Sequence, residues 1–599
     1  MPTMNSEAGI KGAADQLQKS SRSWVWNMLS IRCRGKIMVT MAEKPWLKQY
    51  RLGPYKLPQT KEPYPKITVH SLLDASSAEF PDKAACFYLG KEISYSEMKI
   101  LTDRLAAALA DLGVKKGDKV ATVLPNCPQF MISDFGIMKA GAAHVPCSVM
   151  HKAADLVYEV GDSGAETVIC SDMSLELVNS IKDKTKINNI IVTSVMDYSS
   201  EEPELKKTPG AYQFRDLIAG HEPKPPQVDI DPMKDLAVLP FTGGATGLPK
   251  GVMITHYNRV AAVIQIAWAY EPLKVGIRGK TSGMIPIPLF HAYGHGMMHF
   301  GVYWGLKGYL IPDPRDTDML VQMLMKYRPF FCACVPTQYS RLVAKGLGRL
   351  STMFVSTTAA LAPEIAQKFR QETGVPITEA YGLTETGGGT HMNLSSFAKI
   401  TGFMPFEKFG SIGVPLPDTD VKIVDLDTGE EAVPGKEGEL WVRGPQVMIG
   451  YWPEIGKGLV DGWLPTGDVV KMEEDGYFYI TDRVKDMANI SGLKVYTRLV
   501  DDVLYEHPAV GDAVAIGIPD PERPGSERIK AFIRLKKEYE GKVTSEDIIG
   551  HCREKLPAYA VPRFIEFREE LPLTVTLKLF KRQLREEEKA KMKVKGELT

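Results

Sequence analysis

The chain of 599 residues carries 73 lysine and arginine residues against 73 aspartate and glutamate residues, so its formal net charge is zero. This length exceeds what a single hydrophobic core supports, and it predicts a body of several subdomains with at least one separate domain. Because the charges balance, the chain lacks the overall field that attracts nucleic acid or an anionic membrane. We therefore expect small-molecule substrates and no nucleic-acid partner, while the oligomeric state stays open.

The cysteines and the apolar runs bear on the compartment. Eight cysteines are scattered singly, apart from the pair Cys332 and Cys334, which is typical of reduced and buried thiols in a cytoplasmic protein. No apolar run reaches the roughly 20 residues that a membrane-spanning helix needs. We expect no transmembrane segment, and peripheral contact with a membrane stays open.

Residues 1–41 differ from the rest of the chain. They are rich in basic residues and have no periodic apolar pattern. A targeting peptide, a basic surface helix and an over-long start that precedes Met38 or Met41 all fit this composition. We interpret the segment as an extension that is disordered or not part of the fold.

From about Thr68 onward, helical and strand patterns alternate. Residues 94–113 have the apolar spacing of a helix, whereas 119–125, 142–148 and 166–171 are short runs rich in apolar and β-branched residues. Strands that alternate with helices predict an α/β body built mainly on parallel sheets.

Two further parts follow in the second half of the chain. Residues 421–445 contain short strand patterns joined by glycine and aspartate turns, which predicts a small β-rich subdomain. The charged turn at 481–486 leads into a last segment of about a hundred residues, a size that can fold as a separate domain.

A glycine-rich stretch, "FTGGATGLPKG", occupies residues 241–251. Strand patterns at 236–241 and 252–255 flank it, so we expect a loop between two strands, and the next helix is predicted to begin at Thr255. Glycine lets backbone N–H groups close around a phosphate, threonine adds hydroxyl donors and lysine adds a positive charge.

Two interpretations of this stretch fit the residues taken alone. It is not a Walker loop, because Lys250 stands between Pro249 and Gly251, and neither neighbour suits the opening of a helix. A phosphate-binding loop and an ordinary flexible turn both remain open on this evidence.

The order T-G-G-x-T-G-x-P-K-G resembles the phosphate-binding signature of the acyl-adenylate-forming, or AMP-binding, superfamily, which includes medium- and long-chain fatty acid–CoA ligases. Other stretches that resemble blocks of this superfamily follow in the expected order: "IPLFHAYG", "YGLTETG", "TGD", "DRVKDMANISGLKV" and "LPLTVTLKLFKRQLRE". The resemblance covers about residues 44–585, and several ordered blocks are more specific than one loop.

The resemblance implies an α/β fold in two domains. A large N-terminal AMP-binding domain over 42–484 would contain two α/β sheet subdomains and a small β-barrel-like subdomain. A small, mobile α+β lid domain would cover 485–599. The implied reaction joins a carboxylic acid to ATP as acyl-AMP, releases pyrophosphate, and then transfers the acyl group to coenzyme A.

The resemblance also implies a role for individual residues. Magnesium would be held by Glu385 and Thr246, both oxygen donors that suit this ion. Tyr381 would lie against the adenine, Thr384 near the α-phosphate, and Asp468 with Arg483 at the ribose. The implied nucleotide contacts also include Thr242, Gly243, Gly244, Ala245, Thr246, Gly247, Lys250, Glu379 and Ala380.

Near the C-terminus, Lys578 falls on the adenylation lysine of the superfamily, a point charge that would bridge carboxylate and α-phosphate. Lys485 falls on the hinge at which the small domain pivots. The pantetheine arm of coenzyme A would pass near Ser491 and Gly492. His291 would be the gate histidine of the acyl site, so that Lys578, Glu385, Thr246 and His291 form the implied catalytic set.

Some positions depart from the superfamily pattern. Ala245 replaces a threonine or serine, Thr357 and Thr358 replace a usual glycine pair, and Leu577 replaces the glycine before the terminal lysine. Two more departures are Asn489, which replaces a lysine near the face implied in thioester formation, and Leu499, which replaces an acidic residue of the following helix.

His291, His295 and His299 recur at four-residue spacing and could chelate zinc from one helix face. Gly294 and Gly296 argue against a regular helix at its start, and no acidic residue lies close in sequence. We therefore disfavour a metal site here.

The pattern also bears on the acid. The stretch before His291 has no acidic residue that would hold an amino group, which favours an acid without an α-amine. Gly382 stands where acetate-activating relatives carry a blocking tryptophan, and "KPWLKQYRLGPY" resembles the lead-in of long-chain ligases. We expect a medium- to long-chain fatty acid, with an aromatic, alicyclic or shorter acid, or a non-catalytic nucleotide- or acyl-binding protein, as alternatives.

Overall fold

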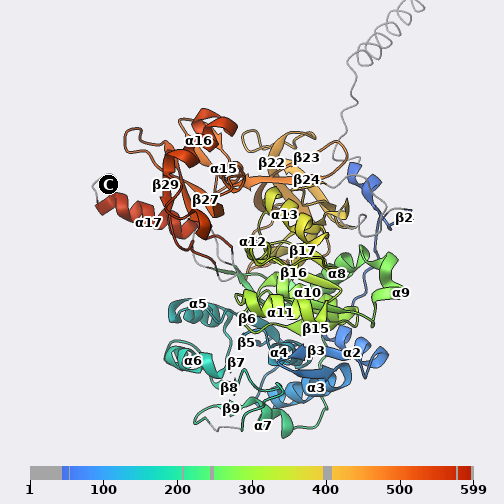
Figure 1. The fold of residues 1–599 in the computed structure, drawn as a ribbon. Coiled ribbons are helices and arrows are strands. Elements are labelled where there is room, and N and C mark those ends of the chain that lie inside the picture. The colour runs from blue at the N-terminus through green and yellow to red at the C-terminus, as the bar shows by residue number, and fades with distance from the viewer. Residues whose placement is uncertain are drawn as a thin grey trace, which may run out of the picture.

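The computed structural model describes residues 44–52, 54–204, 208–242, 249–395, 408–574 and 578–594. The predicted extension at 1–41, the loop residues Gly243–Gly247 and Leu577 lie outside the described residues. In Figure 1 the chain passes from α/β layers at the bottom, through a central sheet, to a C-terminal unit at the upper left.

The first layer is a seven-stranded sheet in the order β13-β10-β6-β5-β7-β8-β9. Its pairs are parallel, apart from the antiparallel pair of β10 with β13. The strands are β5 Lys119–Val123, β6 Ala143–Cys147, β7 Thr167–Ser171, β8 Asn189–Thr193, β9 Tyr212–Gln213, β10 Leu236–Val238 and β13 Ile254–Thr255. The predicted strands at 119–125, 142–148 and 166–171 are confirmed.

The second layer is a nine-stranded sheet in the order β20-β19-β18-β17-β16-β14-β15-β3-β4. Its six inner strands, from β18 to β3, are parallel to their neighbours. The bounds are β3 Ala84–Tyr88, β4 Lys91–Ser94, β14 Ser282–Ile285, β15 Lys307–Leu310, β16 Phe331–Cys334, β17 Met353–Ser356, β18 Ile377–Leu383, β19 Gly388–Met392 and β20 Val414–Pro415.

Helices lie between and outside these two sheets (Figure 1). One continuous hydrophobic core joins α3, α4, α8 and α10 to strands of both sheets. The helices of the body are α2 His70–Glu79, α3 Tyr95–Asp111, α4 Pro128–Lys139, α5 Ala153–Ser163, α6 Leu175–Ile181, α7 Phe214–Ala219, α8 His256–Trp268, α9 Lys274–Ile277, α10 Ala292–Tyr303, α11 Thr317–Tyr327, α12 Pro336–Lys345 and α13 Pro363–Thr373.

The predicted β-rich segment at 421–445 supplies two strands of a four-stranded antiparallel sheet, and the other two strands follow it in the chain. Its strands are β21 Asp420–Val424, β22 Glu437–Arg443, β23 Leu464–Met472 and β24 Phe478–Arg483. Along β22, buried and half-buried residues alternate, as expected for a sheet with one face on the core. This sheet carries two of the predicted site residues, Asp468 and Arg483.

The C-terminal unit has its own core and mixes strands with helices, as predicted. A hairpin of β25 and β26 precedes a three-stranded sheet in which β27 and β28 are antiparallel and β29 is parallel to β28. Its elements are β25 Ala488–Ile490, β26 Leu493–Val495, α15 Thr497–Tyr505, β27 Val510–Pro519, β28 Glu527–Leu535, α16 Ser545–Lys555, β29 Phe564–Phe567 and α17 Lys581–Val594.

The two described ends of the glycine-rich stretch are strands, and residues 243–248 between them lie outside the described residues. β11 Phe241–Thr242 pairs antiparallel with β12 Lys250–Gly251, so both ends of the loop are held at adjacent positions. Helix α8 starts after Thr255, whose hydroxyl accepts a hydrogen bond from Asn258 N, a cap that satisfies one of the free N–H groups at the helix start. The predicted helix start is thus confirmed.

Seven of the eight cysteines lie in the described ranges, and all seven are buried free thiols, as predicted. Across the same ranges, every helix is too short or too polar to cross a membrane by itself.

Candidate active site

The predicted site residues gather where strand β18 of the central sheet ends. After Leu383 the chain makes a single helical turn, Thr384–Thr386, and Gly387 with φ of +57° then reverses it into β19. Because β18 is parallel to β17, this turn lies at the carboxyl edge of the parallel strands, where ligands bind in open α/β sheets. The "YGLTETG" block therefore faces the C-terminal side of the sheet.

Asp468 connects the central sheet with the small antiparallel sheet. In the β23–β24 register Asp468 stands opposite Arg483, whose Nε donates to its Oδ1 at 2.7 Å. The hydroxyl of Tyr381, on β18, donates to Oδ2 at 2.7 Å. Asp468 raises the pKa of Arg483, and burial followed by Asp468 raises that of Tyr381, so the trio holds one anion and one cation.

Glu385 and Lys250 meet at Tyr451. The Tyr451 hydroxyl donates to Glu385 Oε1 at 2.7 Å, and Lys250 Nζ lies 4.9 Å from the centre of the same ring. Met448 N also donates to the Glu385 carbonyl at 2.7 Å. The base of the glycine-rich loop and the predicted magnesium ligand are therefore neighbours. Tyr451 was not among the predicted residues. It lies in "MIGYW", outside the stretches that resemble family blocks, so its sequence neighbours offered little indication of a role in the site.

Lys578 comes from the C-terminal unit and lies among these groups. Burial lowers its pKa to about 8; Arg483 and Lys485 act in the same direction, while Asp468 and Glu385 oppose it. Two bonds to Thr574 hold its backbone, from Lys578 N to Oγ1 at 3.1 Å and from Thr574 N to the Lys578 carbonyl at 2.7 Å.

His291 lies close enough to Lys578 for the lysine charge to act on it. It caps α10, and its Nδ1 accepts a bond from Tyr293 N at 3.3 Å. Burial first, and then the charge of Lys578, lower the pKa of His291 to about 3, so the imidazole is neutral at physiological pH.

On strand β18, Glu379 is buried and Ala380 is half-buried. Glu379 accepts a hydrogen bond from Gly410 N at 3.0 Å, and burial raises its pKa to about 8 although Arg498 opposes the shift. Ala380 pairs with Met392 across the β18–β19 hairpin. Glu379 lies two residues and Ala380 one residue before Tyr381 on this strand.

Lys485 occupies the turn after β24, and its positive charge helps to lower the pKa of Lys578. Two other predicted residues lie apart from this centre. Ser491 and Gly492 form the exposed turn of the β25–β26 hairpin, with bonds to Ser526 Oγ and Asn489 Oδ1. Asn489, a departure from the family pattern, therefore has a structural role in this turn.

One departure from the family pattern, Thr358, and one residue that bears on the acid, Gly382, have local consequences. Thr358 has a φ of +80°, a conformation that glycine adopts freely and threonine does not, and its buried Oγ1 has no partner among the described residues. At Gly382 an added Cβ would lie 2.0 Å from the Gly388 carbonyl oxygen. The hairpin itself thus requires glycine at 382.

The expectation that Gly294 and Gly296 disturb the helix carrying the histidines is wrong. Helix α10 is regular from Ala292 through Gly294 and Gly296, and an acidic residue does lie close in space. Asp134, on α4, accepts bonds from His295 Nε2 at 2.7 Å and His299 Nε2 at 2.6 Å, and these three groups are spaced as metal ligands can be. His291 is not part of this group.

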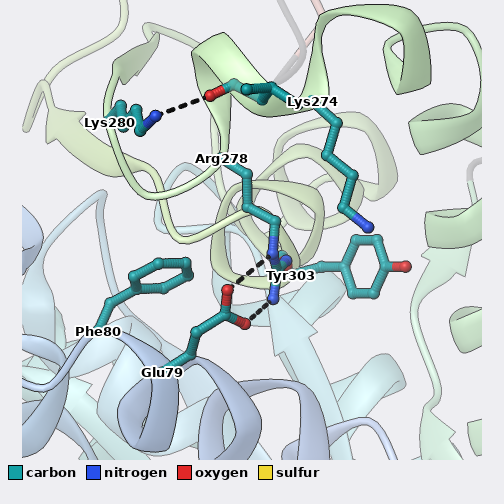
Figure 2. Close-up of a pocket in the computed structure, with 7 residues that line it drawn as sticks. Glu79, Phe80, Lys274, Arg278, Lys280 and Tyr303 are labelled. Atoms are coloured by element: carbon teal, nitrogen blue, oxygen red, sulfur yellow. Dashed lines mark hydrogen bonds and ion pairs between the residues drawn. The ribbon is translucent and has the colours of Figure 1, made fainter.

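A separate surface hollow of about 570 Å³ opens at the far end of α10 (Figure 2). Arg278 bonds Glu79 there and donates to the Tyr303 carbonyl, so its charge is already engaged. Tyr303 ends the helix that His291 caps, so the hollow lies roughly 18 Å along α10 from His291 at 1.5 Å per residue. The hollow is lined by Glu79, Phe80, Lys274, Val275, Arg278, Lys280 and Tyr303.

Relatives of the chain were found by sequence. A long-chain-fatty-acid–CoA ligase of Bacillus subtilis (strain 168) is 37% identical over 577 residues, which cover 91% of this chain and 98% of the relative. One of Escherichia coli O157:H7 is 32% identical over 579 residues, covering 92% and 99%.

Solved structures share the fold. The anthranilate CoA ligase AuaEII, in complex with anthranoyl-AMP, is 26% identical with a TM-score of 0.78, covering 90% of this chain and 99% of that one. A benzoate CoA ligase from Burkholderia xenovorans LB400, 24% identical with a TM-score of 0.75 and covering 87% and 100%, has the same fold.

Fold and site together define a two-part α/β enzyme in which the charge of a lysine from a small C-terminal unit interacts with carboxylates at the edge of a parallel sheet. The chain belongs to the AMP-binding enzyme family: the family model matches residues 73–452, and the model of the AMP-binding enzyme C-terminal domain matches residues 499–578.

Thr358→Gly should raise the free energy of unfolding by about 1 kcal/mol, because it removes a side chain from a left-handed conformation. The midpoint of urea denaturation measures the change. Thr357→Gly is the matched control, since Thr357 is buried without a positive φ, and it should not stabilise. A stabilised Thr357 variant beside an unchanged Thr358 variant would contradict the assignment of strain.

Proposed function

We propose that the protein is an AMP-forming acid–CoA ligase whose acid is a medium- to long-chain fatty acid. Two relatives named long-chain-fatty-acid–CoA ligases, 37% and 32% identical over nearly the whole chain, support the class of acid. The observation that carries the proposal is that Lys578, from the C-terminal unit, lies near enough to Glu385 and Asp468 for both carboxylates to raise its pKa against the effect of burial. Two anions, a carboxylate and a triphosphate, react only where cations and donors are already in place.

The nucleotide would bind along β18 and β23. Asp468 would accept hydrogen bonds from the ribose hydroxyls with Arg483 beside it, and a carboxylate has about four acceptor sites, of which Tyr381 and Arg483 use two. Tyr381 would flank the adenine together with Glu379 and Ala380. Thr384, at the start of the next turn, would face the α-phosphate.

The outer phosphates would lie at the glycine-rich loop. Thr242 and Lys250 hold its two ends together, and the loop residues Gly243, Gly244, Ala245, Thr246 and Gly247 keep the roles that the family pattern implies. Glu385 fits a magnesium ion, because the Tyr451 bond occupies one carboxylate oxygen and leaves the other for a hard cation. Bound magnesium, held by Glu385 and Thr246, would neutralise phosphate charge.

Lys578 would act at the reacting atoms. Its ammonium group would bridge the acid carboxylate and the α-phosphate, and so neutralise charge that accumulates in the transition state. His291, neutral and adjacent, would border the acyl side without repelling the incoming carboxylate.

The second step would use another face of the C-terminal unit. We set the division of the domains between residues 484 and 485, with Lys485 as the hinge, because a turn directly follows β24 there. Ser491 and Gly492, exposed and apart from Lys578, would meet the pantetheine arm of coenzyme A after rotation. The buried free thiols support a cytoplasmic location.

One observation favours an alternative acid. Thr357 and Thr358 add bulk after β17, at the edge where the site lies, and would suit a shorter or aromatic acid such as that of the anthranilate CoA ligase relative. A non-catalytic binding protein is less favoured, because Lys578, Glu385 and Asp468 are all present and assembled.

The acid panel tests the function directly. With ATP and magnesium, saturated acids of eight to eighteen carbons should support exchange of pyrophosphate into ATP, and adding coenzyme A should yield AMP and thioester in equal amounts. Benzoate and anthranilate are the comparison acids. Exchange with the aromatic acids alone would overturn the fatty acid assignment, and no exchange with any acid would overturn the enzyme.

The pKa of Lys578 predicts a pH dependence. Burial depresses it to about 8, so the ammonium form is lost as the pH rises through that value, and kcat/KM for adenylation should fall above it. Lys578→Arg keeps its charge throughout this range and should abolish the fall, even if its maximal rate is lower. A decline near pH 8 that persists in the arginine variant would assign the titration to another group.

A further inference from the structure

A buried arginine holds the turn that carries Glu385. Arg259, on α8, is fully buried, and its Nη1 donates to the carbonyl of Gly387, the residue that ends the Thr384–Thr386 turn. Its Nε and Nη2 have no acceptor among the described residues, so all of its direct hydrogen bonding falls on Gly387. Burial lowers the pKa of Arg259 to about 10, which leaves the guanidinium charged at neutral pH.

Gly296 of α10 faces both Arg259 and the turn. A Cβ at Gly296 would lie 3.4 Å from Arg259 Nη1 and 3.7 Å from the Gly387 oxygen, which are ordinary contact distances. Gly296, which as a sequence feature argued against a helix, therefore lies in a regular helix that packs closely against the guanidinium and the turn.

The charge that opposes Arg259 is Asp134. Within the described parts of the chain no carboxylate lies within ion-pair distance of Arg259, and Asp134 is the group that raises its pKa through space. Three imidazoles satisfy this carboxylate: His295 and His299 bond its two oxygens, and His144 Nδ1 bonds Oδ1 at 2.7 Å. Although burial alone would raise it, the histidines hold the pKa of Asp134 well below its usual range.

The same cluster is poorly suited to a metal ion. Metal-bound histidines normally donate their second ring N–H to an acceptor, yet His299 Nδ1 is buried without a partner in the described structure. A divalent ion here would also add charge beside a buried guanidinium, with only one carboxylate to balance both. Counter-charge for Arg259 is the role that these contacts favour.

We infer that Arg259 is a positioning residue for adenylation: through the Gly387 carbonyl it fixes the turn from which Glu385 projects, and Asp134 with its three histidines balances its charge. The inference rests on the proposed function, in which Glu385 is a magnesium ligand. Glu385 is also held independently of Arg259: Met448 N donates to its backbone carbonyl, and the Tyr451 hydroxyl donates to its carboxylate. Loss of Arg259 should therefore loosen the carboxylate without removing it.

The test is the magnesium dependence of ATP–pyrophosphate exchange in wild type and in Arg259→Met. The variant should need about tenfold more free magnesium for half-maximal exchange, as expected from losing one hydrogen bond to a charged donor, and excess magnesium should restore part of the rate. Arg259→Lys keeps the charge and should show a shift in the same direction but smaller, which keeps the test open if the methionine variant does not fold.

Gln265→Met is the matched control. Gln265 is also a buried polar residue of α8, but its hydrogen bonds among the described residues go to Pro417, Thr419 and Gln446 and not to the Glu385 turn. It should reduce the amount of folded enzyme, counted by titration with acyl-AMP, without shifting the half-saturating magnesium concentration. If both arginine variants also lost folded enzyme without a shift in the half-saturating magnesium concentration, the inference would be overturned, because a purely structural role predicts that result.

Two further outcomes distinguish failure of this inference from failure of the proposed function. About one tightly bound zinc or other divalent ion per chain, found by mass spectrometry of wild type and lost in His299→Ala, would overturn the assignment of Asp134 as counter-charge. Wild type that shows no magnesium-dependent exchange with any acid would overturn the proposed function and this inference together, whereas normal wild-type exchange with unshifted arginine variants overturns the inference alone.

Discussion

The carboxylate of Asp468 is the contact on which the rest of the site depends. It receives Tyr381 from the central sheet and Arg483 from the small sheet, each at 2.7 Å, and it opposes the lowering of the Lys578 pKa by the other cations. One buried anion thereby interacts with three segments that are far apart in the chain. Removing that anion would leave the charge of Arg483 without its partner, which is costly for a half-buried group. It would also remove a link between the two sheets.

The electrostatics favour bound substrate over the free enzyme. Arg483, Lys485 and Lys578 crowd their positive charges together, and burial makes Lys578 easier to deprotonate than an ordinary lysine. Negative phosphates and a carboxylate would relieve this crowding, so part of the substrate's binding free energy would appear as restored proton affinity of Lys578. A preorganised cation of this kind acts on charge that develops during the reaction, which is where an interaction accelerates it.

Local patterns in the sequence predicted much of the fold, whereas contacts between distant segments remained hidden. The apolar runs of β5, β6 and β7 and the cap at Thr255 depend on neighbouring residues, and all were predicted. The meeting of Asp134 with His295 and the bond from Tyr451 to Glu385 join residues 161 and 66 positions apart, and no local pattern encodes them. Gly294 and Gly296 misled because helix propensity is weak beside tertiary packing: α10 is buried along most of its length and tolerates both glycines. The family blocks placed Asp468, Arg483, Tyr381 and Lys578 in one site, and their contacts agree with that grouping, but their individual roles in binding stay predictions.

Single-turnover kinetics of Lys578→Ala, followed in each half-reaction separately, test the central claim that the C-terminal unit completes the adenylation site. Adenylation of the acid should slow by at least about 100-fold, the usual cost of losing one transition-state donor. Transfer of the acyl group from supplied acyl-AMP to coenzyme A should remain largely intact, because the second step would use the face that carries Ser491 and Gly492. An equal loss in both half-reactions would contradict the account, since Lys578 would then support the domain as a whole and not the first chemical step.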